Sequence, residues 1–214
     1  MMQKRQEQLL EIMRGQPVIP VIRIEHADDA VPMVEALVRG GLPAVEITLR
    51  TPAAIDAIRA AAAGCPDAIV GAGTILNTSQ FKEAAAAGSR FIVSPGATIE
   101  LLDTARNSDV PLLPGAITPS EMMAMRQEGY TALKFFPAEQ AGGAAFLKSI
   151  ASPLADITFC PTGGIGPKNA MDYLRLPNVA CVGGSWITPD DAMKAKDWDR
   201  IEALAREAAS LAAQ

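Results

Sequence analysis

The chain has 214 residues, of which 49% are hydrophobic and 20% are charged, so it has the composition of a globular protein that can bury a full core. Its formal net charge of −5 argues against a broad nucleic-acid-binding surface, because phosphate backbones require an excess of basic residues. The N-terminus is charged and amphipathic, and no apolar run reaches the length of a membrane span, so we expect a cytoplasmic protein without a membrane partner.

Eight short runs rich in Val, Ile and Leu alternate with longer amphipathic runs, and Gly or Pro stands at most junctions. A leading helix is expected over about residues 4–15. The expected strands then lie at 17–22, 44–49, 68–73, 90–95, 110–116, 131–136, 157–164 and 179–184. The expected helices lie at 27–41, 51–64, 77–88, 98–108, 118–129, 143–151, 166–177 and 190–214.

These eight units, each of about 20 to 26 residues, predict an α/β fold of the (β/α)8 TIM barrel type. The leading helix would be an extra N-terminal helix that covers the bottom of the barrel. We see no linker, charge block or low-complexity tract, so we expect a single domain over residues 1–214. A doubly wound sheet is the alternative, which the even spacing of the units disfavours.

Cysteine and histidine usage limits the possible chemistry. The three cysteines, Cys65, Cys160 and Cys181, show no C-x-x-C spacing, which fits a reducing compartment and neither a disulfide framework nor a zinc site. The single histidine, His26, excludes a multi-histidine metal site and is interpreted as a solvated residue at a helix start. We therefore expect no metal and no cofactor.

The second expected strand, "AVEITLRT", alternates between apolar and polar residues. With a period of two, Glu46, Thr48 and Arg50 share one face, which must point into the barrel. A carboxylate and a guanidinium are costly inside a barrel unless they are paired or used in chemistry. Either they form an ion pair without chemistry, with Glu46 bound to Arg50 or to Lys134, or they belong to an active site.

The sixth expected strand, in "YTALKFFPAE", places Lys134 among apolar residues. Burial of an unpaired ammonium costs several kcal/mol or drives it to the neutral amine, which is a nucleophile. Strands two and six face each other across a barrel, so Lys134 and Glu46 are expected to converge. A lysine amine condenses with a ketone to a Schiff base, and a nearby carboxylate serves the proton transfers that follow.

The ends of four further strands carry polar residues or glycines. Strands seven and eight end in "CPTGGIGP" and "VGGSWITPDD", where paired glycines let the backbone approach a ligand and a following helix start adds positive potential. The loops after these two strands commonly bind phosphate in such barrels, and Thr162 and Ser185 stand beside the glycines. Thr74 and Pro95 are expected at the rim after strands three and four.

Six motifs, taken in order, resemble those of the 2-keto-3-deoxy-6-phosphogluconate (KDPG) aldolase family: "EITLRT", "IVGAGT", "SPG", "KFFPAE", "CPTGGI" and "GGSW". The resemblance covers nearly the whole chain. It implies a class I aldolase of the Entner–Doudoroff pathway, often also active on 4-hydroxy-2-oxoglutarate (KHG). It further implies a phosphorylated keto acid and pyruvate as ligands and a homotrimer as the assembly.

The resemblance also implies a role for each matching residue. Lys134 would form the Schiff base, and Glu46 would be the general acid/base. Arg50 and Thr74 would hold the carboxylate of the pyruvyl portion. Pro95, Phe136 and Thr162 would line the pocket, and Gly163, Gly164, Gly184 and Ser185 would bind the phosphate. Thr162 would also favour the gluconate over the galactonate isomer.

Two other functions fit the same residues. A sugar-phosphate isomerase or epimerase would use Glu46 as a base and Lys134 as an electrostatic clamp, and its activity would resist borohydride. A non-catalytic sensor of a phosphorylated acid would use Lys134 only in an ion pair, and it would bind ligand without turnover. We favour the aldolase because a sensor has no need of a carboxylate facing a desolvated amine.

Overall fold

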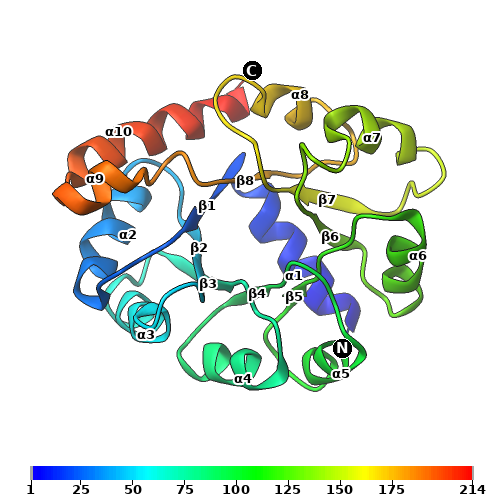
Figure 1. The fold of residues 1–214 in the computed structure, drawn as a ribbon, viewed down its shortest axis with the longest axis horizontal. Coiled ribbons are helices and arrows are strands. Elements are labelled where there is room, and N and C mark those ends of the chain that lie inside the picture. The colour runs from blue at the N-terminus through cyan, green and yellow to red at the C-terminus, as the bar shows by residue number, and fades with distance from the viewer. Residues whose placement is uncertain (1, 214) are drawn as a thin grey trace.

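The computed structural model describes residues 2–213; Met1 and Gln214, the ends of the expected domain, lie outside the described residues. The chain has an α/β fold in which a curled parallel sheet is surrounded by helices (Figure 1). The strands are β1 Val18–Ile22, β2 Ala44–Thr48, β3 Ile69–Gly73, β4 Phe91–Val93, β5 Leu112–Leu113, β6 Ala132–Phe135, β7 Thr158–Pro161 and β8 Val182–Gly184.

The helices follow the strands in regular alternation. They are α1 Met2–Arg14, α2 Ala30–Arg39, α3 Ala54–Gly64, α4 Thr78–Ala86, α5 Ile99–Arg106, α6 Pro119–Gln127, α7 Gly143–Ile150, α8 Ala170–Leu174, α9 Asp190–Ala195 and α10 Trp198–Ala209, with short 3-10 turns η1 Ala27–Asp29 and η2 Ser210–Ala213. Several expected elements are shorter than the sequence suggested, among them the fifth strand, which has two residues in place of 110–116, and the eighth helix, which has five in place of 166–177.

Strand pairing is parallel throughout and runs in two sheets. Six strands pair in the order β5-β4-β3-β2-β1-β8, and β6 pairs with β7. Isolated parallel bridges connect Gly115 with Lys134, Thr162 with Gly183, and Phe159 with Val179. The carboxyl ends of these strands therefore lie at the same end of the sheet. A functional site is expected at that end in a parallel α/β fold.

Two apolar clusters fill the molecule. One lies between strands and outer helices and includes Val45 and Ile47 of β2, as the alternation of that strand predicted. The other lies inside the curled sheet, where Leu9, Ile12 and Met13 of α1 pack against inward-facing residues of several strands. Figure 1 shows α1 crossing the middle of the ring of strands.

A glutamine fixes α1 against the beginning of β6. The Gln6 side-chain oxygen accepts hydrogen bonds from the amides of Thr131 and Ala132, at 2.9 and 3.0 Å. Gln6 is buried, so it satisfies two backbone donors that would otherwise have no partner at the strand start. The helix thus occupies the end of the sheet opposite to the carboxyl ends.

The prediction of one continuous last helix over residues 190–214 is wrong. It divides into α9 and α10, because Lys196 adopts φ 53° in the left-handed region and ends α9. The Asp197 side chain then accepts a hydrogen bond from the Arg200 amide at 3.1 Å and caps α10. Lys196 also forms an ion pair with the buried Asp29, whose carboxylate lies 2.7 Å from the ammonium.

Candidate active site

Lys134 and Glu46 meet inside the curled sheet. Lys134 Nζ lies 3.4 Å from Glu46 Oε1, and the two side chains are only 7% and 4% exposed. Lys134 is the third residue of β6 and Glu46 the third of β2, so inward orientation and parallel strand direction bring them together from positions 88 residues apart. The structure thus confirms that Lys134 and Glu46 lie next to each other, as expected from the sequence.

The backbone of Lys134 is paired on both sides, and an aromatic ring lies near its ammonium group. Its own backbone is hydrogen-bonded on one side to Pro114 and Ala116, each at 2.9 Å, and β7 pairs with it on the other side. The ammonium lies 5.3 Å from the centre of the half-buried Phe136 ring, within the range of a cation–π interaction. A buried ammonium with one carboxylate neighbour has one evident proton acceptor, Glu46, which is the first requirement for an amine nucleophile.

Space for the Glu46 carboxylate comes from a glycine that the sequence analysis missed. A Cβ atom on Gly73, the last residue of β3, would lie 2.0 Å from Glu46 Oε1 and 2.6 Å from its Cγ. Any other residue at position 73 would occupy the volume of the carboxylate. Glycine is common at strand ends, so the sequence carries no signal for this role.

Arg50 is not inside the sheet, and the expectation that it shares the inward face of β2 is wrong. The strand ends at Thr48, so the alternation stops before residue 50, and Arg50 is exposed at the rim. Its Nε donates to Thr48 Oγ1 at 2.7 Å, and that hydroxyl donates to the Ile22 carbonyl at 2.7 Å. Thr48 therefore fixes the direction of the guanidinium, a role that the alternation alone did not assign.

Thr74 and Pro95 lie at the rim after β3 and β4 and are both half-buried. Thr74 has φ 60°, a left-handed conformation that a β-branched residue rarely adopts. Such an outlier costs about 1 to 3 kcal/mol and is concentrated at functional sites. This strained threonine directly follows Gly73, the glycine whose Cβ position overlaps the Glu46 carboxylate.

The glycine pairs after β7 and β8 come side by side. The bridge between Thr162 and Gly183 joins the two strand ends, and a Cβ on Gly183 would lie 2.2 Å from Thr162 Oγ1. Gly163 and Gly164 have φ of 104° and 75°, which only glycine adopts freely. Gly184 leaves room for the Trp186 ring, because a Cβ on Gly184 would lie 2.3 Å from that ring. Ser185, between these two residues, is exposed.

One expectation for these loops needs correction. Helix α8 begins at Ala170 and not at residue 166, and α9 begins at Asp190 as expected, so neither helix starts directly after a glycine pair to add its partial charge there. The Thr162 hydroxyl is buried and has no hydrogen-bond partner among the described residues.

The Cys181 thiol, which lies near Glu46, is kept in its protonated form. A hydrogen bond with Cys160, together with burial and the charge of Glu46, raises the pKa of the Cys181 thiol well above its usual range. Cys65, Cys160 and Cys181 are all buried and free, as expected. His26 is exposed before η1, as expected, and its side chain makes no cap hydrogen bond.

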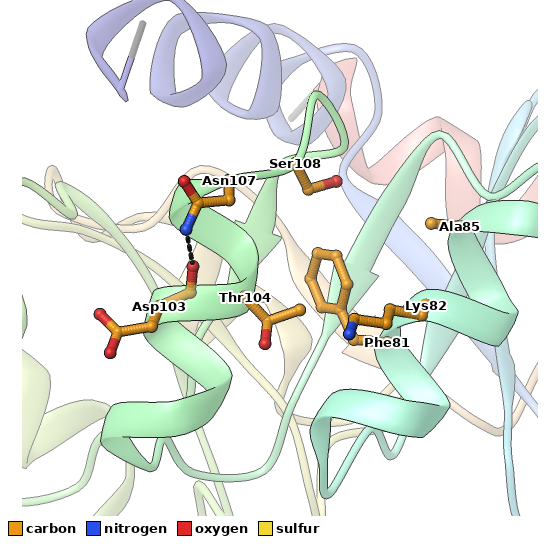
Figure 2. Close-up of a pocket in the computed structure, with 7 residues that line it drawn as sticks. All are labelled: Phe81, Lys82, Ala85, Asp103, Thr104, Asn107 and Ser108. Carbon is orange, nitrogen blue, oxygen red and sulfur yellow. Dashed lines mark hydrogen bonds between the residues drawn. The ribbon is translucent and has the colours of Figure 1, made fainter.

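Surface features of the described residues lie apart from this centre. A cavity of about 480 Å³ opens between α4 and α5, and none of the sequence-predicted site residues lines it (Figure 2).

Within residues 2–213, no three Asp, Glu, His or Cys side chains form a group that could hold a metal ion. No helix in that range is long and apolar enough to cross a membrane.

Comparison with known proteins identifies the family of this chain. Residues 9–204 match the family described as "KDPG and KHG aldolase". The chain belongs to the KDPG and KHG aldolase family. The KHG/KDPG aldolase of Escherichia coli is 53% identical over 192 residues, which cover 90% of each chain.

Solved structures of family members have the same fold. KDPG aldolase from Legionella pneumophila, with pyruvate captured as a covalent carbinolamine intermediate, superposes with a TM-score of 0.92 at 47% identity, covering 94% of this chain and 98% of that one. The structure of the Zymomonas mobilis aldolase with 3-phosphoglycerate superposes with a TM-score of 0.89 at 46% identity, and the match covers 94% of each chain. Members of this family thus bind both pyruvate and a phosphorylated acid.

Proposed function

We propose that this chain is a class I aldolase that cleaves KDPG reversibly into pyruvate and glyceraldehyde 3-phosphate. The observation that carries the proposal is the buried pair of Lys134 Nζ and Glu46 Oε1 at 3.4 Å. Membership in the aldolase family supports it, as does the carbinolamine that pyruvate forms in the Legionella pneumophila protein. Cleavage of KHG is part of the proposal, since the Escherichia coli relative is named for both substrates.

The first half of the reaction makes the covalent intermediate. Glu46 takes a proton from the Lys134 ammonium, and the free amine attacks the C2 ketone to give a carbinolamine. Glu46 then protonates the departing hydroxyl, so that water leaves and a protonated Schiff base remains. The rigid backbone of β6 holds the amine in place for this attack, which reduces the entropic cost of the encounter.

The second half breaks the C3–C4 bond. Glu46, directly or through a water molecule, removes the proton of the C4 hydroxyl, and the bonding electrons flow into the Schiff base to give an enamine. Glyceraldehyde 3-phosphate leaves, Glu46 returns a proton to C3, and hydrolysis releases pyruvate and Lys134. No oxidant, reductant or metal is needed to balance these steps.

The remaining residues position the two ends of the substrate. Arg50 and Thr74 hold the carboxylate beside C2, a role supported by the hydrogen bond that Arg50 donates to Thr48 and by the strained Thr74 backbone. Pro95 and Phe136 pack beside the pyruvyl portion. Thr162 contacts the hydroxyl groups of the substrate, a role that its own hydroxyl group supports, since that group has no hydrogen-bond partner within residues 2–213. Gly163, Gly164, Gly184 and Ser185 bind the phosphate through backbone N–H groups and one hydroxyl.

The assembly that we propose is a cytoplasmic homotrimer of single-domain subunits. In each subunit, residues 1–214 form one closed (β/α)8 TIM barrel, with α1 as an extra N-terminal helix under its bottom. The three isolated bridges between the two sheets support closure. Light scattering should give three times the mass of the 22.5 kDa chain, and a monomer mass would refute the trimer.

The function is tested with purified protein and KDPG as substrate. Pyruvate, followed with lactate dehydrogenase and NADH, and glyceraldehyde 3-phosphate should appear in equal amounts, with or without a chelator. Conversion of a sugar phosphate without pyruvate would favour an isomerase. Ligand binding by folded protein without any turnover would favour the sensor.

A further inference from the structure

A buried tyrosine on α8 binds a glutamate that follows β6. The Tyr173 hydroxyl donates to Glu139 Oε1, although the two residues are 34 positions apart in the chain. Tyr173 is 1% exposed, whereas Glu139 lies at the surface. The contact therefore ties one surface carboxylate to the fixed core of the protein.

Glu139 packs directly on the loop that follows β7. Its backbone amide donates to the Gly163 carbonyl at 3.1 Å. A Cβ on Gly164 would lie 2.6 Å from Glu139 Cγ and 2.8 Å from Glu139 Cβ, so the side-chain stem occupies the space beside this glycine. Both glycines are thus held by the same residue, one through its backbone and the other through its side chain.

The opposite side of this loop has its own support. Asn169 Oδ1 accepts from the Gly166 amide at 2.8 Å, and Asn169 Nδ2 donates to the Gly164 carbonyl at 3.1 Å. The loop is therefore held between Asn169 and the Tyr173–Glu139 pair. Two glycines in left-handed conformations would otherwise have wide backbone freedom.

Charge repulsion gives a reason for the hydrogen bond that holds the Glu139 carboxylate on Tyr173. A mobile Glu139 side chain would repel an anion bound at the neighbouring backbone N–H groups. Burial, followed by the hydrogen bond to Glu139, raises the pKa of Tyr173, so the hydroxyl remains a donor across the physiological range. One carboxylate oxygen is thereby kept on the tyrosine.

We propose that Tyr173 and Glu139 are positioning residues for the phosphate end of the substrate, because they fix the Gly163–Gly164 backbone in the conformation that binds the anion. The inference rests on the proposed function, which assigns the phosphate to these glycines and supplies the two substrates. Neither residue touches Lys134 or Glu46, so the bond-breaking steps do not depend on them.

The test compares two tyrosine variants and two substrates. Tyr173→Phe removes the hydroxyl, and KM for KDPG should rise roughly 10-fold with kcat nearly unchanged. KHG carries no phosphate, so its KM should stay within about 2-fold of the wild type. Tyr130→Phe is the matched control, because the Tyr130 hydroxyl is also buried but has no hydrogen-bond partner among the described residues.

Variants of the acceptor separate the hydrogen bond from the charge. Glu139→Ala loses both the acceptor and the stem beside Gly164, and its KM for KDPG should match that of Tyr173→Phe or exceed it. Glu139→Gln keeps an oxygen that accepts from Tyr173, so its KM should stay at or below the wild-type value. Rescue by glutamine distinguishes positioning from a requirement for negative charge.

The outcomes that would overturn the inference are specific. An unchanged KM for KDPG in Tyr173→Phe, or an equal loss on KDPG and KHG, would refute a role at the phosphate end. If the wild type cleaves neither substrate, the proposed function fails, and affinity for inorganic phosphate, measured by phosphorus NMR titration, decides this inference by itself. Weaker phosphate binding in Tyr173→Phe than in Tyr130→Phe would support it, and equal binding would refute it.

Discussion

Replacing Gly73 with alanine tests whether Glu46 must occupy its observed position. The added Cβ would lie 2.0 Å from Glu46 Oε1 and 2.6 Å from both Cγ and Cδ, where ordinary carbon contacts are about 3.5 Å or more. Gly73 does not have a left-handed φ, so alanine fits the backbone and the overlap is the main cost. The carboxylate must move by roughly 1 Å or more from its observed position beside Lys134.

The expected loss follows from the role of Glu46 in proton transfer. General acid–base catalysis contributes about 10²- to 10⁴-fold, so kcat of Gly73→Ala should fall at least about 100-fold. Overpacking a buried site costs about 1 to 3 kcal/mol, which urea unfolding measures separately from activity. The assay is pyruvate release from KDPG, coupled to NADH oxidation.

The control is alanine at a glycine far from the site. Gly15 lies after α1, and a Cβ there would meet only the carbonyl oxygens of Glu11 and Ile12, at 3.3 and 3.4 Å. Gly15→Ala should keep wild-type activity. A folded Gly73→Ala protein with kcat within about 3-fold of the wild type would refute the role given to the Glu46 position.

Three further predictions concern buried polar groups. Lys134→Met should abolish turnover and lower stability by about 3 kcal/mol, because it leaves the Glu46 carboxylate buried without its partner; activity near normal would remove Lys134 from the mechanism. Gln6→Ala should cost about 2 kcal/mol in urea unfolding, since the Thr131 and Ala132 amides lose their acceptor, and exposed Gln3→Ala should cost less than about 0.5 kcal/mol. Burial raises the pKa of Tyr130 to about 12, so its contribution to stability is complete below about pH 10 and falls as pH rises toward 12. The difference in unfolding free energy between wild type and Tyr130→Phe, measured between about pH 9 and pH 11.5, should show this slope, and a pH-independent difference would contradict it.

The central pair was predictable from the sequence because it rests on simple periodicities. Alternation along β2 and β6 gives the inward direction of Glu46 and Lys134, and parallel strands of similar length put both at the same depth. Arg50 was misplaced for the same reason, because alternation predicts direction only while the strand continues, and β2 ends at Thr48. The extent of a strand depends on its pairing partners, which a single sequence does not show.

Contacts between distant segments could not be predicted. The Tyr173–Glu139 hydrogen bond joins a short helix to a loop 34 residues earlier, and neither residue stands in a local pattern that indicates the other. Gly73 looks like any glycine at a strand end until the Glu46 side chain from the neighbouring strand is placed beside it. The break at Lys196 was missed because a lysine in the left-handed region gives no signal of the kind that glycine gives.

Whether Lys134 forms a covalent bond with substrate can be measured with pyruvate alone. The protein is reduced with sodium borohydride in the presence of pyruvate and examined by intact-mass and peptide mass spectrometry, with Lys134→Met as the control. We expect one pyruvyl adduct per chain, on the peptide that contains Lys134, and none in the variant. Folded wild-type protein without an adduct, or with the adduct on an exposed lysine such as Lys148, would contradict the Schiff-base mechanism and leave Lys134 with an ion-pair role only.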